Sequence, residues 1–308
     1  MKKTKGIPGH GAFTAERLAR ALLLICAVVA IFAVCAITFY LFAKGLPALH
    51  RVGVGELLFG TIWKPTAAEP RFGIAYIILS SIAGTALSVL VGVPVGLLTA
   101  VFLTEVSSKR LSAIVQPAVE LLAAIPSVIY GLLGMMLLNP VLYKLEKIIF
   151  AGSTTHQYTG GADLLAAVIV LAIMILPTVI SVSAYAIRAV PGQLRAASLA
   201  LGASKMQTIW GVTVPAAKSG ILTGVVLGIG RALGEAMAIN MVAGGSVNLP
   251  LPFNSVRFLT TQLVSEMGYA EGIHRQVLFT VGLVLYLFIM IVNLVLQRLR
   301  REGGKDHG

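Results

Sequence analysis

The sequence predicts an all-α membrane protein, a polytopic helical bundle of about six transmembrane helices. Hydrophobic residues make up 57% of the chain and charged residues only 12%, with a mean hydropathy of +0.91, whereas about a quarter of a soluble domain is charged. Six apolar runs have the ~20 residues with which a helix crosses the hydrocarbon core of a bilayer. These spans consume most of the 308 residues. Any energy source for transport is therefore expected to be a gradient or another polypeptide.

The predicted helices follow a basic tail at residues 1–20, in which five lysines and arginines face the single acid Glu16. The first apolar run, residues 21–43, is longer than the core of a signal peptide and no A-x-A cleavage motif follows it, so an uncleaved membrane helix is predicted. The other runs lie at residues 74–103, 111–138, 164–187, 220–242 and 276–296. Together they form a transmembrane domain, 21–298, and a short tail at 299–308 follows.

Two long polar connections are predicted on the outer side. Residues 44–72 contain several prolines and are expected to connect the first two helices, in a position where they can lie along the membrane surface. Residues 139–163 are expected to form a second outer loop. His156 in this loop and His274 before the last helix are expected to be ordinary solvated residues.

The distribution of lysine and arginine orients the predicted bundle. The two tails, the turn at 104–110 and the segment 188–218 together hold 15 basic residues, against 8 in the three connections on the other side. Loops rich in lysine and arginine stay in the cytoplasm. Both termini are therefore predicted to be cytoplasmic, with the chain in the bacterial cytoplasmic membrane. The net charge of +12 is accounted for by this orientation, and no nucleic-acid partner is expected.

The segment 189–218 is amphipathic, basic and free of acids. Pro191 and Gly192 end the preceding helix. Leucines, Met206 and Trp210 supply an apolar side, and Gly202 is expected to bend the segment between two short helices. One interpretation is a surface helix resting on anionic lipid; the other is a docking surface for a partner protein.

The fifth apolar run carries two charges, Arg231 and Glu235. Charges inside a membrane are costly and usually face a bundle interior. Residues four apart share one face of a helix, so the two are predicted to pair, with the guanidinium fork available to a passing oxyanion. The alternative is an ion pair that only locks the helix against its neighbours.

Other chemistry-bearing residues are sparse. Glu120, within the third run, is a secondary candidate that either contributes to the path or has a structural role, by reaching the membrane interface or pairing with Lys109 or Arg110. Cys26 and Cys35 are predicted to be packing residues, and no cluster has the spacing of a metal site. The sequence contains no G-x-x-x-x-G-K-[ST] loop, so ATP is not expected to bind this chain by that device.

Gly202, nine further residues and the run Val212–Pro215 resemble the cytoplasmic loop signature of ABC importer permeases. The family triplet begins here with Ala196, where the family often has glutamate. The resemblance implies a coupling helix on the cytoplasmic side, seated in a groove of an ATPase subunit. The positions implied in this coupling are Arg195, Ala196, Ala197, Gly202, Ala203 and Pro215.

Further segments are similar to the PstC family of phosphate-importer permeases. They are GLPAL at 45–49, LLFGTIWKP at 57–65, ELLAAIPSVIYGLLG at 120–134 and GRALGEAMA at 230–238. The resemblance implies phosphate passage near Arg231 and Glu235. It also implies a PstA-like second permease, a PstB-like ATPase dimer that carries ATP and Mg, and an external PstS-like phosphate-binding protein. No cofactor and no catalytic residue is then expected on this chain.

Two alternatives remain at this point. An ABC permease for another oxyanion, such as sulfate or molybdate, shares most of these features. A proton-coupled secondary transporter, with Arg231 and Glu235 as a proton-linked pair, leaves the segment 189–218 unexplained and usually shows internal repeats. A non-transporting membrane scaffold is a third, weaker alternative.

Overall fold

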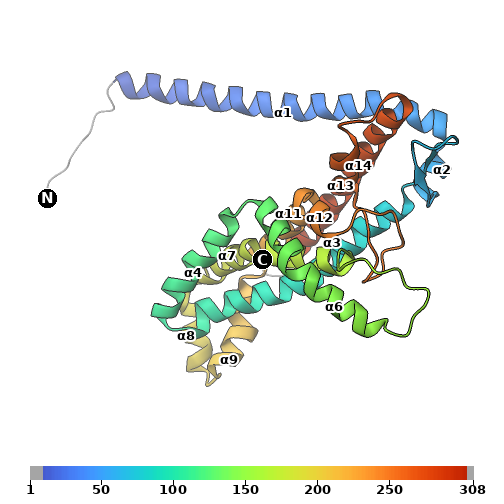
Figure 1. The fold of residues 1–308 in the computed structure, drawn as a ribbon. Helices are drawn as coiled ribbons and strands as arrows, with labels where there is room; N and C mark the ends of the chain where they lie inside the picture. Colours follow the sequence, from blue (N-terminus) through green and yellow to red (C-terminus); the bar gives the residue numbers. More distant parts are fainter. Residues whose placement is uncertain (1–9, 304–308) are drawn as a thin grey trace.

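The computed structural model describes the backbone of residues 10–303 and the side chains of residues 16–298. The outer parts of the two predicted tails, residues 1–9 and 304–308, lie outside the described residues. The described chain is a bundle of long helices, as predicted, and it also contains one short hairpin that was not predicted (Figure 1). Five of its helices are long and apolar enough to cross a membrane, or six if one bent pair counts as a single span.

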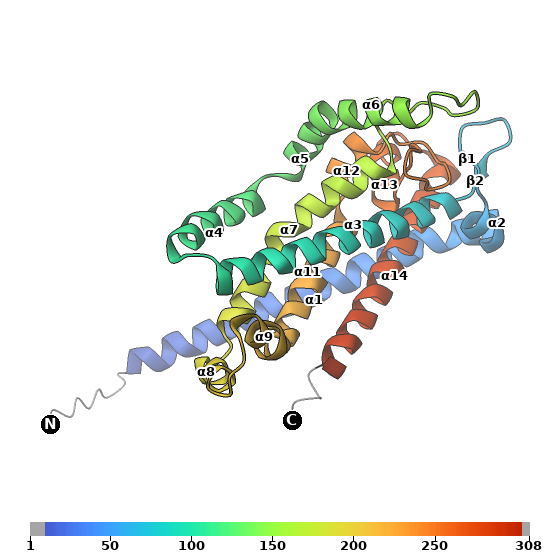
Figure 2. The ribbon, with the colours of Figure 1, turned by 90° about the horizontal axis from the view of Figure 1, so that it is seen from below.

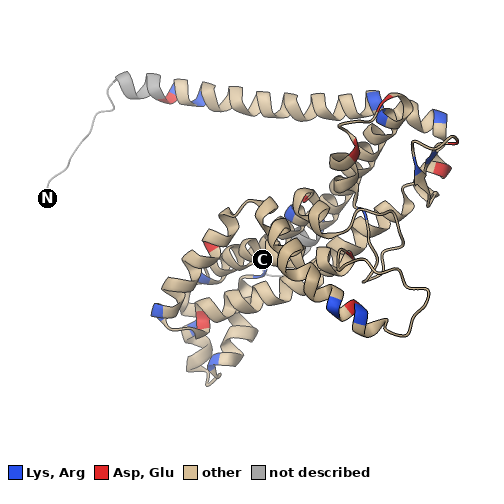
Figure 3. Cartoon of the chain, viewed as in Figure 1, with Lys and Arg blue, Asp and Glu red and all other residues tan. Residues whose placement is uncertain are grey.

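The first helix, α1 (His10–Val52), is much longer than the predicted span 21–43. Residues 44–52, predicted to begin a polar connection, continue the helix and pack against α14 (Gly272–Gly303). Ala48 is fully buried there, and the Thr280 hydroxyl donates to the Gly45 carbonyl at 2.7 Å. This packing explains why the helix continues through Pro47. The rest of α1 extends away from the bundle and is uncharged over most of its length (Figure 3).

The connection after α1 is compact. It contains the short helix α2 (Val54–Phe59) and an antiparallel hairpin of β1 (Trp63–Lys64) and β2 (Arg71–Phe72), with Trp63 opposite Phe72. Leu57 and Phe72 are buried against α3, α13 and α14. We call this side of the molecule the hairpin end.

The centre of the bundle is the parallel pair of α3 (Ala75–Val101) and α7 (Leu164–Arg188), with α11 (Lys218–Gly234) packed against both. In α7, 61% of the most apolar window is buried, against 33% or less in the other spans. A side chain at Gly92 would meet Ile175 and the Ala172 carbonyl within 3.0 Å. Such small residues allow membrane helices to approach closely. Both spans agree with their predicted positions.

The third predicted span is broken. Helix α4 (Lys109–Ala124) ends at Ile125, whose extended conformation is the one favoured before a proline, here Pro126. The chain resumes as α5 (Ser127–Leu133), the π-helical turn η2 (Gly134–Leu138) and α6 (Asn139–Ile149). The apolar span therefore covers Ser127–Ile149. The prediction of a loop from residue 139 is wrong, because α6 is amphipathic and buries Leu142 and Glu146.

The segment after α7 forms α8 (Gly192–Ala200), α9 (Lys205–Thr208), the π-helical turn η3 (Ile209–Thr213) and α10 (Val214–Ala216). Gly202 makes the predicted bend at a φ of 86°, a conformation that glycine adopts without strain. Ser204 and Gln207 form a capping box at α9. The helices from Lys205 to Gly234 are bent by 69° at a short break.

After α11 the chain forms α12 (Met237–Val242), a loop, α13 (Leu259–Glu266) and α14. The start of α1, the turn between α3 and α4, the α8–α9 segment and the last turns of α14 all lie toward one side, which we call the α8 end (Figure 2). The hairpin, α6 and α13 lie toward the opposite end (Figure 2). This grouping matches the two sides that the charge distribution predicts.

Candidate coupling region and substrate path

Arg195 connects α8 to the body of the bundle. Its guanidinium forms an ion pair with Glu105 at 2.8 Å and donates to the Ile187 carbonyl, near the end of α7, at 2.7 Å. Glu105 belongs to η1 (Phe102–Val106), the π-helical turn that ends α3. The exposed fractions of the two side chains are 28% and 13%. Arg195 therefore links α8 to both central helices, a contact that the sequence did not predict because Glu105 was counted only as a loop charge.

The outer surface of α8 and α9 is unusually apolar. Ala196, Ala197 and Gly202 are exposed, and Ala203 and Pro215 are half-buried. Large apolar side chains around them are also exposed, and Leu201 is 90% exposed. The others are Leu194, Leu199, Met206 and Trp210. We call this surface the coupling face. The Ser198 and Thr208 hydroxyls, 2.9 Å apart, tie α8 to α9 beneath it.

Arg231 and Glu235 do not form the predicted ion pair. Helix α11 ends at Gly234, and Glu235 has extended angles of φ −74° and ψ 127°. The prediction of a pair within one continuous helix is therefore wrong, since the helix ends between the two residues and no ion pair joins them. Glu235 is buried, its carboxylate accepts from the Ala238 amide at 3.0 Å, and its carbonyl accepts from Thr260 at 2.7 Å. The glutamate thus fixes the start of α12.

Arg231 lies where the two broken helices meet. Helix α5 packs against α12, so the break at Pro126 and the break at Glu235 are neighbours. Tyr130 spans the first break by donating to the Leu122 carbonyl at 2.7 Å. The half-buried Arg231 is close enough to interact electrostatically with the Tyr130 hydroxyl. Among the described side chains, no carboxylate lies within ion-pair distance of Arg231. We call this place the break junction.

Glu120 is exposed on α4, away from Arg231 in sequence and on a different helix. Its carboxylate accepts from the Gln116 amide and the Tyr185 hydroxyl, each at 3.2 Å. Within residues 16–298 it pairs with neither Lys109 nor Arg110.

Two polar networks at the hairpin end were not expected. Buried Glu266 accepts from Trp63, Arg257 and His274, with the His274 nitrogen at 2.8 Å. Fully buried Glu146 contacts His156 at 2.8 Å and accepts from the Thr159 amide at 2.9 Å. The prediction of solvated histidines is therefore wrong, because each ring satisfies a buried carboxylate.

Asp163 begins α7 beside the second of these networks. Its carboxylate caps the helix by accepting from the Ala166 amide at 2.9 Å. Burial raises the pKa of Asp163 from 3.8 to about 6, partly offset by this hydrogen bond and reinforced by the nearby Glu146 charge.

Residues that could hold a metal are not grouped together in the part of the chain that the structure describes. Cys26 and Cys35 are free and exposed on α1, so the prediction that they are packed is wrong for the isolated chain.

Residues 92–302 match the family described as "Binding-protein-dependent transport system inner membrane component". The chain belongs to this family. It is 40% identical to the probable ABC transporter permease protein YqgH of Bacillus subtilis (strain 168), over 89% of this chain and 88% of that one. It is 34% identical to the phosphate transport system permease protein PstC of Xylella fastidiosa (strain 9a5c), over 84% of each chain. PstC of Pasteurella multocida (strain Pm70) is 30% identical over 81% of this chain and 82% of its own.

Solved structures support the same fold. A chain of the bacterial alginate ABC transporter, in complex with its alginate pentasaccharide-bound periplasmic protein, has a TM-score of 0.64. The match covers 96% of this chain and 98% of that one, at 16% identity. The chain is thus a permease subunit of an ABC importer, a multi-pass inner-membrane protein and a transport component rather than a catalytic one.

Proposed function

We propose that this permease carries inorganic phosphate into the cytoplasm, driven by a separate ATPase that docks on the coupling face. The observation that carries the proposal is the position of Arg231 at the break junction. A guanidinium stays charged at any working pH and matches the oxygens of phosphate. Discontinuous helices near the middle of a membrane are typical of substrate sites in transporters. The PstC relatives named above support phosphate as the oxyanion.

The coupling step follows from the ion pair between Arg195 and Glu105. ATP binding and hydrolysis, with Mg, take place on the partner ATPase, which pushes on the exposed apolar side chains of α8 and α9. Arg195 transmits this displacement to the end of α3 through Glu105 and to α7 through the Ile187 carbonyl. Short π-helical turns such as η1 and η3 are frequent at functional sites of helices. They are the points at which we expect the two helices to yield.

The partners follow from the same proposal. A PstA-like permease would complete the path, a PstB-like ATPase dimer would cover the α8 end, and a PstS-like binding protein would deliver phosphate at the hairpin end. The α8 end, with both termini, would then face the cytoplasm. Apolar side chains along α1, such as Leu23 and Phe32, are more than 70% exposed in the isolated chain, and lipid or the second permease would cover them.

Phosphate uptake into proteoliposomes tests the proposal. The chain would be reconstituted with its co-expressed permease and ATPase, with radiolabelled phosphate and binding protein outside and ATP inside. We expect uptake that requires both ATP and binding protein and that excess sulfate does not reduce. Strong competition by sulfate or molybdate would assign another oxyanion. Uptake by the chain alone under a proton gradient would contradict the proposal and favour a secondary transporter.

A further inference from the structure

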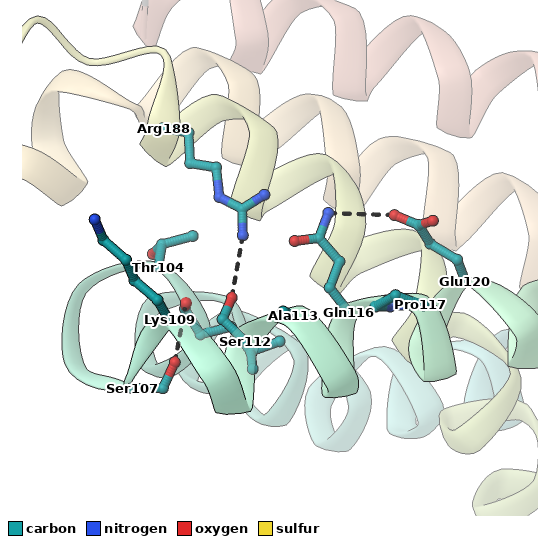
Figure 4. A pocket seen from close by; sticks show the side chains of 10 residues that line it. Thr104, Ser107, Lys109, Ser112, Ala113, Gln116, Pro117, Glu120 and Arg188 are labelled. Atoms are coloured by element: carbon teal, nitrogen blue, oxygen red, sulfur yellow. Dashed lines mark hydrogen bonds between the residues drawn. The ribbon is translucent and has the colours of Figure 1, made fainter.

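A cavity lies at the α8 end, apart from the break junction. It has a volume of about 510 Å³ and lies between the end of α3, the start of α4 and the end of α7 (Figure 4). Its polar lining comes mainly from Thr104, Ser107, Lys109, Ser112, Glu120 and Arg188. We call it the α4 pocket. None of these residues belongs to the break junction around Arg231 or to the coupling face.

The two cations of the α4 pocket are not neutralised by the protein. Arg188 reaches from α7 toward α4, where it donates to the Ser112 hydroxyl at a long 3.4 Å, and Lys109 rises from the first turn of α4 (Figure 4). Neither forms an ion pair with a carboxylate of residues 16–298. Nearby Glu105 is already held by Arg195. Two uncompensated cations at one pocket repel each other, and a bound anion would relieve this repulsion.

The one acid of the pocket is engaged at its other side. Glu120 lies beyond Gln116, which donates to it at 3.2 Å, and it also accepts from Tyr185 (Figure 4). The pocket is therefore polarised along α4: the carboxylate lies about three turns from Lys109 and about two turns from Ser112, where Arg188 is bound. The first turn of the 16-residue α4 adds the positive end of its dipole to the cationic side.

Of the three hydroxyls around this cationic end, those of Thr104 and Ser107 already donate to backbone carbonyls, at 2.8 Å and 3.2 Å, so Ser112 is the one with a proton to offer an anion. Ser107, Ser112 and Thr104 line the cavity in half-buried positions. The Ser112 hydroxyl accepts from Arg188 and keeps its own proton available for donation. In proteins, phosphate oxygens accept hydrogen bonds from guanidinium, ammonium and serine hydroxyl groups.

We propose that the α4 pocket binds a phosphate group at the α8 end of the permease. Inorganic phosphate and the headgroup of an anionic lipid share this chemistry. The apolar side chains of α4 that face outward, Ile114 and Leu121, are each at least 70% exposed, so α4 presents a surface to which acyl chains can pack beside the pocket. The site is independent of Arg231, and its occupancy does not require that phosphate be the transported ion.

The test compares the double variant Lys109→Gln/Arg188→Gln with the charge-matched control Lys144→Gln/Lys147→Gln, whose lysines are exposed at the hairpin end. One arm titrates the full chain in phosphatidylcholine nanodiscs with inorganic phosphate, using chloride as the reference anion. The other arm measures by native mass spectrometry how much phosphatidylglycerol the chain retains from mixed nanodiscs. The variant Arg188→Lys keeps the charge and is measured in both arms. It tests the proposal even if the double variant fails to fold.

In the phosphate arm or the lipid arm, the double variant is expected to bind roughly tenfold more weakly, the loss for two partly exposed charge contacts, and the control to bind as wild type. A loss in the first arm assigns free phosphate; a loss in the second alone assigns a lipid headgroup. In the same arm, Arg188→Lys should bind within about twofold to threefold of wild type, since the charge remains and the fork is lost. Equal binding by wild type, double variant and control in both arms would overturn the proposal. Arg231→Gln removes the contact proposed for transport, so in that background the loss caused by Lys109→Gln/Arg188→Gln reports on the α4 pocket alone and is readable even if the transport proposal fails.

Discussion

The continuous pair α3–α7 and the discontinuous pair α5–α12 are built from similarly apolar residues but have different structures. The first pair runs without interruption, buries small residues in its contact and carries no ionised side chain along its interface. The second pair adjoins the breaks at Pro126 and Glu235, beside the half-buried Arg231. The difference indicates a division of labour, in which the continuous pair is a scaffold and the broken pair forms the path. Changes in the scaffold should reduce stability, and changes at the break junction should reduce transport.

The largest effect is expected at the break junction. Replacing Arg231 by glutamine removes a charge-assisted contact to the passing anion, and such contacts contribute roughly 1.5–3 kcal/mol, or about 10- to 100-fold in rate. ATP-driven phosphate uptake should fall by this factor while the melting temperature in detergent stays near the wild-type value. Arg275→Gln, an exposed arginine on α14, is the control and should transport normally. Full uptake by Arg231→Gln would remove the difference between path and scaffold.

The scaffold should respond in the opposite way. In Gly92→Ala the added methyl would lie 2.7 Å from Ile175 and 3.0 Å from the Ala172 carbonyl. Overpacking of this kind costs roughly 1–3 kcal/mol of unfolding free energy. Thermal or denaturant unfolding of the purified chain should show the loss.

The matched control for the scaffold is Gly55→Ala. Gly55 is also helical, but a methyl there meets no atom within 4 Å. Its stability should be unchanged or slightly raised, because alanine favours helix. Equal stability of the two variants would contradict the close packing of α3 on α7.

The link between the coupling face and the scaffold should have a smaller effect. Arg195→Ala and Glu105→Gln each break one partly buried ion pair, so ATP hydrolysis by the assembled importer should continue with less phosphate moved per ATP. The double variant should be little worse than either single variant, since the two residues act as one unit. Arg110→Ala, an exposed arginine at the same end, should leave the ratio unchanged. Additive losses in the double variant would argue against transmission through this pair.

The subtlest prediction concerns pH. The pKa of Asp163 is raised to about 6 in the folded chain from 3.8, so the folded state holds the proton more tightly than the unfolded state. Its contribution to stability is present below about pH 4 and is lost as the pH rises through about 6. Asp163→Asn keeps a capping oxygen but does not titrate.

The comparison that isolates this effect is the difference in melting temperature between Asp163→Asn and wild type. It should grow in favour of the variant from pH 4 to pH 6 and stay constant above that range. A difference that does not change with pH would show that Asp163 titrates normally. Transport is expected to be unaffected, because Asp163 begins a scaffold helix.

The sequence predicts the scaffold well and the path poorly. The spans at 74–103 and 164–187 are continuous apolar runs, and length alone places them. The bend at Gly202 was also predicted, since a glycine in the middle of an amphipathic segment favours a break between two short helices. The break at Glu235 could not be predicted, because the four-residue spacing from Arg231 fits a helix equally well. Only the packing of α12 and the hydrogen bonds of Glu235 to Ala238 and Thr260 stabilise the interruption.

The hairpin end shows a second limit of sequence reasoning. Lys144, Glu146 and Lys147 make residues 139–149 look like a polar loop, yet they form one amphipathic helix with Glu146 inside. Its partner His156 lies ten residues on, and the partners of Glu266 come from as far away as Trp63. Such pairings depend on tertiary contacts, and no local pattern indicates them.

The central claim is that the path passes the break junction, and substituted-cysteine labelling tests it most directly. In a chain with Cys26 and Cys35 replaced by serine, Ala236→Cys places a thiol at the break beside Glu235, and Leu90→Cys places one on the exposed side of α3. During ATP turnover in proteoliposomes, we predict that a water-soluble thiosulfonate labels position 236, that saturating phosphate slows this labelling, and that position 90 is unaffected by phosphate. Labelling at position 236 that is absent, or that phosphate does not change, would contradict the account.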